Sequence, residues 1–101
     1  MHARVTALKV DTEVTTVDDA LNRFRAAVLP SLREQAGYRG IYVLGTPAGE
    51  GLLVSLWATE DAARVDHEGD WYYEVMRDLA TLLREAPGPV TYEVLAADLA
   101  G

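Results

Sequence analysis

The sequence predicts a single α+β domain, residues 1–101, in which strands and helices follow one another in the order β-α-β-β-α-β. The chain has 101 residues, 50% of them hydrophobic and 25% charged, which is typical of one globular domain. Short runs rich in β-branched residues and bounded by Gly or Pro indicate the strands. Two longer stretches carry apolar residues every three or four positions, which is typical of helices that cover one side of a sheet.

The N-terminal part predicts a strand followed by a helix. From Ala3 to Val10 the sequence is short, β-branched and loosely alternating. We expect a helix to begin at Thr16, because its hydroxyl can cap the helix N-terminus. The carboxylate of Asp19, three residues later, interacts favourably with the positive end of the helix dipole. Pro30 is expected to kink this helix or to divide its last turn from the rest, and Gly37 to end it. The apolar stripe of the helix consists of Leu21, Phe24, Val28 and Leu32.

The middle of the chain predicts a β-hairpin. The apolar runs 38–46 and 52–59 are joined by residues 47–51, a loop longer than two residues that contains Pro and Gly. Both runs are apolar at both sets of alternating positions, whereas a strand buried on one face alternates cleanly. We therefore expect this hairpin to be covered on both faces.

The C-terminal part predicts a second helical region and a last strand. The helical region runs from about Glu60 to Ala86 and is interrupted near Gly69, where Asp70 can cap a fresh start. Residues 87–89, Pro-Gly-Pro, end it, and residues 90–95 form the last strand. This order matches the ferredoxin-like arrangement, a four-stranded antiparallel sheet with both helical regions on one side.

The opposite side of such a sheet has no cover of its own. The hairpin is apolar on that side too, and a contiguous exposed apolar face of this extent is rare in monomers. We expect a homodimer in which two sheets pack face to face. The alternative is a monomer with an exposed apolar face.

Composition excludes several classes of function. A net charge of -7 and a pI near 4.6 disfavour binding to nucleic acid or to an anionic membrane. The absence of Cys removes disulfides, thiolate nucleophiles, Cys-type zinc sites and iron–sulfur clusters. The first ten residues lack the apolar core of a signal peptide, and no stretch approaches the roughly 20 apolar residues of a membrane span. We expect a cytoplasmic protein.

The sequence predicts neither a metal nor a cofactor. Its histidines are His2 and His67 alone, and no carboxylates occur at recognisable ligand spacing. A P-loop, a dinucleotide fingerprint and a Gly-x-Ser-x-Gly elbow are all missing from the sequence.

Three segments carry a resemblance to a known family: Leu29-Pro30, Gly37 to Tyr42 (GYRGIY) and Val54 to Ala62 (VSLWATEDA). Through them the chain resembles, over nearly its whole length, the antibiotic biosynthesis monooxygenase family. The resemblance implies a ferredoxin-like subunit, a dimeric α/β barrel and a pocket between each sheet and its own helices. Characterised members include cofactor-free oxygenases that convert phenolic or anthrone polyketides to quinones, and related barrels cyclise polyketides, isomerise small organics or degrade heme.

The sequence disfavours membership of the heme-degrading branch of these barrels. That branch typically uses an Asn on the first strand together with a Trp and a His in the second helical region. Here the first strand has no Asn, and His67 precedes Trp71 instead of following a helical Trp.

His67 is the candidate general base, because a neutral imidazole with a pKa of about 6.5 is the usual one. The resemblance places it, with Arg64 and Tyr72, in the segment that lines the pocket, where Arg64 is a candidate stabiliser of an anion. Trp71 and Tyr72 offer flat ring walls for a polycyclic substrate. The alternatives are that His67 is exposed among its acidic neighbours and that Trp71 and Tyr72 only pack the core.

The first two strands offer further candidates. Arg39 and Tyr42 can present a cation and a phenol to an enolate, although alternation puts them on opposite faces unless a bulge intervenes. A structural role for each is the alternative. Arg4 has small neighbours that leave room for a ligand on their face of the strand, and it points away from that face. Trp57 is interpreted as a packing or interface residue.

Three functions remain. The first is cofactor-independent monooxygenation of an aromatic or polyketide-like substrate by a small-molecule enzyme of secondary metabolism. The second keeps the pocket and changes the reaction to cyclisation, dehydration or isomerisation without oxygen. The third is a non-catalytic dimer that binds a ligand or stabilises a partner.

Overall fold

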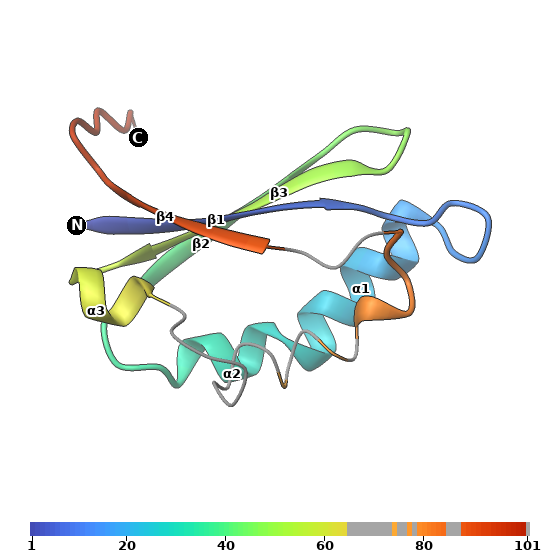
Figure 1. The fold of residues 1–101 in the computed structure, drawn as a ribbon, viewed down its shortest axis with the longest axis horizontal. Coiled ribbons are helices and arrows are strands. Elements are labelled where there is room, and N and C mark those ends of the chain that lie inside the picture. Colours follow the sequence, from blue (N-terminus) through green and yellow to red (C-terminus); the bar gives the residue numbers. More distant parts are fainter. Residues whose placement is uncertain (65–73, 75–76, 78, 85–87, 101) are drawn as a thin grey trace.

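A computed structural model describes residues 1–64, 74, 77, 79–84 and 88–100. Its four-stranded antiparallel sheet has the order β2-β3-β1-β4, formed by β1 (His2–Lys9), β2 (Tyr38–Gly45), β3 (Glu50–Trp57) and β4 (Gly88–Glu93). The helices α1 (Val17–Ala27), α2 (Leu29–Arg33) and α3 (Glu60–Ala63) lie on one side of it, here called the covered side (Figure 1). The C-terminal segment leaves the sheet toward the other side, the open face. The predicted ferredoxin-like fold class is confirmed.

The first helix begins and breaks where the sequence predicts. The Thr16 hydroxyl accepts a hydrogen bond from the Asp19 amide at 3.0 Å, and α1 follows directly. Val28 separates α1 from α2, and Pro30 stands in the first turn of α2, where it leaves no helical hydrogen bond unmade. Gly37 has φ +82° and lies so close to Ala62 that a Cβ at Gly37 would approach the Ala62 Cβ to 2.8 Å. Only glycine fits this turn into β2.

Three strands begin earlier than predicted, β1 by one residue and β3 and β4 by two. The hairpin loop spans residues 46–49, because the Thr46 amide donates to the Glu50 carbonyl at 2.9 Å and the Gly49 amide to the Thr46 carbonyl at 3.0 Å. β3 therefore includes Glu50 and Gly51, neither of which has an apolar side chain that the hydropathy pattern could reveal. β4 likewise begins at Gly88, and Pro89 is tolerated there because β4 is an edge strand.

The second helical region begins at Glu60, as predicted, but its first helix is shorter and its C-terminal end comes earlier. Its first helix, α3, is capped by the Thr59 hydroxyl but ends after one turn at Ala63, since Arg64 is extended with ψ 143°. Residues 74, 77, 79 and 80 are helical, and Leu83 already pairs with Val10 in a β-bridge, so the region ends before Ala86. The predicted interruption at Gly69 lies outside the described residues.

The core fills the covered side of the sheet. Alternation along β3 directs Leu53, Ser55 and Trp57 toward the helices, and the pairing of β1 with β3 adds Arg4 and Thr6 to the same side. The buried apolar residues of this core cluster are Phe24, Val28, Leu32, Leu53, Trp57, Ala63 and Leu79.

The open face carries the apolar side chains that alternate with those of the core along the strands. The strand register places Val54 between Val5 and Tyr42, with Val90 on the next strand. Large apolar side chains of this face are exposed in the single chain, among them Tyr42 (49%), Leu44, Leu52 (38%), Val90 (51%) and Tyr92 (55%). One face of the hairpin is thus turned away from the helices and exposed in the single chain, so the expected cover on both faces stays a prediction that depends on a second subunit.

Candidate functional site

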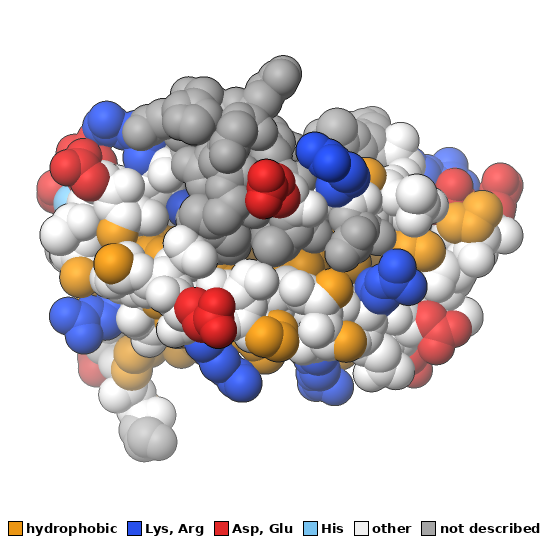
Figure 2. All heavy atoms as spheres, turned by 90° about the horizontal axis from the view of Figure 1, so that it is seen from below, with side chains coloured by type: hydrophobic (Ala, Val, Ile, Leu, Met, Phe, Trp, Pro, Cys, Tyr) orange, Lys and Arg blue, Asp and Glu red, His pale blue; other side chains and the backbone are white. Residues whose placement is uncertain are grey.

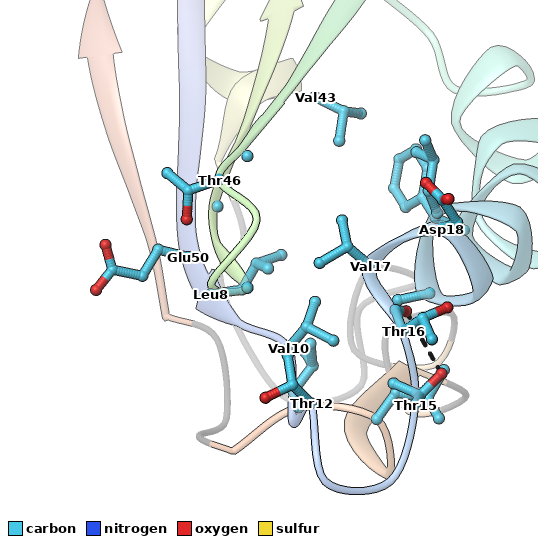
Figure 3. Close-up of a pocket in the computed structure, with 18 of the residues that line it drawn as sticks. Leu8, Val10, Thr12, Thr15, Thr16, Val17, Asp18, Val43, Thr46 and Glu50 are labelled. Atoms are coloured by element: carbon cyan, nitrogen blue, oxygen red, sulfur yellow. Dashed lines mark hydrogen bonds between the residues drawn. The ribbon is translucent and has the colours of Figure 1, made fainter.

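An apolar cleft of about 730 Å³ opens on the covered side, at the hairpin end of the sheet. It lies between the first turn of α1, the hairpin and residues 79–83. In Figure 3 the side chains of Val10, Val17 and Val43 converge on this space, whereas the Glu50 carboxylate points away from it. Deeper walls come from Phe24, Leu53 and Leu79. A cleft of this size is within the usual range for small-molecule sites.

The described polar groups along the cleft are neutral hydroxyls and carboxylates. The hydroxyls belong to Thr12, Thr15, Thr16 and Thr46, and the carboxylates to Asp18 and Glu50. The Thr16 hydroxyl already caps α1, and that of Thr15 donates to the Thr16 carbonyl at 3.5 Å (Figure 3). Among the described lining residues there is no Lys, Arg or His.

A polar cluster occupies the opposite end of the covered side. The Arg4 side chain is buried, with its residue only 2% exposed, and its Nε donates to the Ala63 carbonyl at 2.7 Å and its Nη2 to the Ala62 carbonyl at 3.3 Å. Its guanidinium carbon lies 4.7 Å from the centre of the Trp57 ring. The Trp57 indole donates to the Ser55 hydroxyl at 2.8 Å. Arg4 therefore ties β1 and β3 to the last carbonyls of α3.

Arg4 points away from its small neighbours, as the sequence predicts, but the side to which it points is the covered one. There its side chain donates to the last carbonyls of α3, which a helix end leaves without an intrahelical partner. The lone Arg among small strand residues was the available signal for a buried cation.

Tyr38 adds a phenol to this cluster. Its ring meets the Trp57 ring edge to face, with centroids 5.6 Å apart and an angle of 72° between the planes. Burial raises the pKa of the Tyr38 phenol above 10.0, against the opposing effect of the Arg33 charge. At neutral pH Tyr38 is thus an uncharged hydroxyl that can donate or accept a hydrogen bond.

We expect Arg4→Met to lower the free energy of unfolding by about 2 kcal/mol, because it removes charge-assisted hydrogen bonds to buried carbonyls but keeps an apolar stem. Arg4→Lys will restore little of this, since an ammonium cannot reproduce the planar fork of donors. Urea denaturation followed by circular dichroism measures both. A variant with Met that is as stable as the wild type would contradict the clamping role of Arg4.

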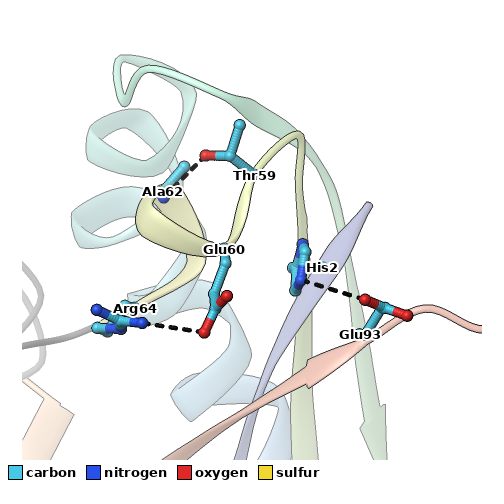
Figure 4. A network of polar contacts seen from close by, with 6 residues as sticks. All are labelled: His2, Thr59, Glu60, Ala62, Arg64 and Glu93. Carbon is cyan, nitrogen blue, oxygen red and sulfur yellow. Dashed lines mark hydrogen bonds and ion pairs between the residues drawn. The ribbon is translucent and has the colours of Figure 1, made fainter.

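The structure separates the predicted site residues that it describes. Arg64 follows α3, with its side chain about half exposed, and its Nη2 lies 2.9 Å from the Glu60 Oε1 (Figure 4). Tyr42 lies on the open face, turned away from the helices. Arg39 is exposed and falls at a bulge, because the register passes from Tyr38 opposite Trp57 to Gly40 opposite Leu56. None of the three lines the apolar cleft.

The other predicted site residues, His67, Trp71 and Tyr72, lie outside the described residues. The resemblance implied a pocket between the sheet and its own helices, and this cleft lies there, but its lining was not predicted because the walls come from segments far apart in the sequence. The signal that pointed toward it was the apolar character of the hairpin on both faces.

Two further polar features lie on the described surface. His2 Nε2 lies 4.0 Å from Glu93 Oε2 and links the start of β1 to the end of β4 (Figure 4). On the helix side, shown in Figure 2, the coloured acidic and basic side chains are interspersed, unlike the basic stripe of a nucleic-acid site.

Two searches of the described residues found nothing. Within these ranges no three His, Asp or Glu side chains gather as a metal site would require. The described part of the chain also contains no helix long and apolar enough to cross a membrane.

Comparison with known proteins finds similarity in structure. No family model matches the sequence, and no match was found among curated proteins. A putative antibiotic biosynthesis monooxygenase from Bordetella bronchiseptica superposes with a TM-score of 0.75 at 16% identity, covering 94% of this chain and 97% of that one. SnoaB, a cofactor-independent oxygenase from Streptomyces nogalater solved as a mutant, gives 0.71 at 13% identity, covering 95% and 94%.

A third similar structure contains a ligand. The monooxygenase ActVA-Orf6 of Streptomyces coelicolor, in complex with nanaomycin D, gives a TM-score of 0.69 at 21% identity, covering 99% of this chain and 92% of that one. The resemblance predicted from the sequence is therefore confirmed at the level of the fold, which the chain shares with antibiotic biosynthesis monooxygenase structures.

Proposed function

We propose that this chain is a small-molecule enzyme of secondary metabolism that catalyses cofactor-independent monooxygenation of an aromatic or polyketide-like substrate. The observation that carries the proposal is the fold shared with SnoaB over almost the whole chain, together with a cleft of suitable size between the sheet and its helices. In this proposal the enzyme acts in the cytoplasm as a homodimer, without a metal, a nucleic acid or a membrane as partner.

The reaction needs a base and an environment that stabilises an anion. In the proposed reaction His67 takes a proton from a phenol or enol, and the resulting anion passes an electron to dioxygen. For an anthrone, one atom of dioxygen becomes the new quinone carbonyl and the other leaves as water with the two hydrogens of the oxidised methylene. The equation balances without an external reductant. Trp71 and Tyr72 form walls of the site. Arg64 and Arg39 do not line the described cleft, so either one would stabilise the anion only after its side chain turns toward the site.

We expect His67→Ala to lower the rate of oxygen uptake by about tenfold or more, since a positioned general base contributes about 10²–10⁴-fold. The assay uses metal-stripped protein, an oxygen electrode and mass spectrometry with a panel of anthrones and hydroxynaphthalenes. His2→Ala is the matched control, because His2 lies beside Glu93 at the other end of β1 from the cleft. Uptake that is unchanged in His67→Ala would keep the reaction and discard the base.

A second candidate is a non-catalytic dimer that binds a ligand. It is favoured by the polar groups of the described cleft lining. These are threonine hydroxyls and carboxylates, and the described lining contains no imidazole and no cation. A third candidate, a cyclase or isomerase, would use the same pocket without oxygen. Anaerobic incubation separates these candidates: an oxygenase stops, a cyclase continues to form product, and a binding protein forms none under either condition.

A further inference from the structure

We propose that Arg84 is a positioning residue of the cleft. It holds the loop 11–15 and the first turn of α1, which form one wall of the cleft, in place against residues 79–83 and the hairpin, which form the facing walls. This inference rests on the proposed function only in taking the cleft as the place where the substrate binds. Arg84 itself does not line the cleft, so it acts through the loop and not on the ligand.

The walls of the cleft meet at a junction of backbone hydrogen bonds around the end of β1. The Val10 amide donates to the Gly49 carbonyl at 2.8 Å, which ties the end of β1 to the hairpin loop. The Asp11 amide donates to the Leu82 carbonyl at 2.8 Å, which ties the start of the loop to residues 79–83. These bonds fix the base of the loop, whereas the residues beyond Asp11 need further support to keep their place.

Asp11 determines the shape of the loop. Its carbonyl accepts hydrogen bonds from the amides of Val14 and Thr15, both at 3.1 Å, and its Oδ1 accepts one from the Glu13 amide at 3.1 Å. The loop thereby turns back and leads directly into the cap of α1 at Thr16. Because Thr15 and Thr16 line the cleft (Figure 3), the placement of the Asp11 turn decides where this wall stands.

The Arg84 side chain supports this turn from outside the cleft. Its Nε lies 3.7 Å from the Asp11 Oδ1, and its Nη2 lies 3.9 Å from the Glu13 Oε1, so one guanidinium bridges two carboxylates of the loop. The side chain of Asp11 is 27% exposed and that of Glu13 83%, so both ion pairs are open to screening by salt. Such pairs add little to overall stability. A wall that is already in place before binding nevertheless costs the ligand less conformational entropy.

The test measures binding of an uncharged aromatic fluorescent probe, N-phenyl-1-naphthylamine, to the full-length protein. We expect Arg84→Gln to raise the dissociation constant of the probe about threefold, which is within the range for exposed ion pairs. Arg84→Lys will restore most of the affinity, because an ammonium still attracts both carboxylates at these distances. An unchanged dissociation constant in Arg84→Gln would overturn the inference.

Two controls accompany these variants. Arg25→Gln removes the same charge from an exposed position in the last turn of α1, outside the cleft lining, and will leave binding unchanged. Val43→Trp fills the cleft from its wall and is expected to weaken probe binding about tenfold or more. Full binding by Val43→Trp would place the probe elsewhere and overturn the inference.

Two further readouts distinguish positioning from a general loss of structure. Asp11→Asn removes the charge but keeps the Oδ1 that accepts the Glu13 amide, so Asp11→Asn combined with Arg84→Gln will bind the probe no more weakly than Arg84→Gln alone. In about 1 M NaCl, where the screening length is about 3 Å, the difference between the wild type and Arg84→Gln will disappear. Additive losses in the double variant, or a difference that persists in salt, would contradict the positioning role.

This test and the oxygen-uptake assay fail separately. If the oxygenase proposal also holds, Arg84→Gln will raise KM for the oxidised substrate about threefold and leave kcat unchanged. Weaker probe binding in Arg84→Gln, without oxygen uptake by the wild type, retains the positioning role and overturns the oxygenase. Oxygen uptake with the same KM and the same probe affinity in Arg84→Gln does the reverse.

Discussion

Replacing Trp57 by alanine will lower the free energy of unfolding by about 3–5 kcal/mol, a large part of the roughly 5–15 kcal/mol available to a domain of this kind. Trp57 is 1% exposed and is among the most completely buried large side chains that the structure describes. Its ring supports the Arg4 guanidinium and the edge of Tyr38, and its indole donates to Ser55. Truncation leaves a cavity and also removes the aromatic surface against which a buried cation rests.

A graded control separates packing from hydrogen bonding. Trp57→Phe keeps an aromatic ring beside Arg4 and Tyr38 but loses the indole donor to Ser55, so we expect a smaller loss, about 1–2 kcal/mol. Urea denaturation monitored by circular dichroism at a fixed protein concentration measures both variants. An alanine variant within 1 kcal/mol of the wild type would refute the packing role.

Leu52→Asp will convert the proposed homodimer into a monomer, weakening association by about a hundredfold or more. Leu52 lies on the open face between Ala7 and Leu44 and is 38% exposed, so a carboxylate there remains hydrated in the single chain. In a face-to-face dimer it would be buried without a counter-charge. A two-fold interface repeats every substitution, so the cost of burial is incurred twice.

Sedimentation velocity over a concentration series measures this change in association. Val14→Asp is the matched control, because Val14 is also an exposed apolar residue (62%) but lies in the loop before α1. A wild-type protein that sediments as a monomer would reject the homodimer outright. A Leu52→Asp protein that remains dimeric would place the interface on another surface.

The sequence predicted those features that depend on neighbouring residues. The Thr16 cap and the break at Pro30 are local, since each is decided within one helical turn. The early start of β3 at Glu50 was missed because it depends on backbone pairing across the hairpin, which leaves no trace in hydropathy. The end of α3 was also missed: the Ala63 carbonyl there accepts a hydrogen bond from Arg4, 59 residues away in sequence, and no local pattern encodes such a contact.

The same distinction applies to the candidate site. Alternation along the strand predicted that Tyr42 and Leu44 share one face of the sheet. It could not tell which face the helices cover, because that depends on the packing of α1 and α2. The sequence could not decide whether a bulge lies at Arg39. The two glycines that flank Tyr38 and Arg39 permit a bulge without requiring one. The cleft required three distant segments to come together, so its aliphatic character became visible only in the folded chain.

Consecutive residues of β3 face two different environments. Leu53 lines the cleft and Leu52 lies on the open face, so one strand is the common wall of both. A ligand and a second subunit, bound as proposed, would contact opposite sides of this wall. If the bound ligand raises the association constant of the two subunits by some factor, thermodynamic linkage requires that the dimer bind the ligand more tightly than the monomer by the same factor. Subunit concentration would thereby act as a regulator of ligand binding.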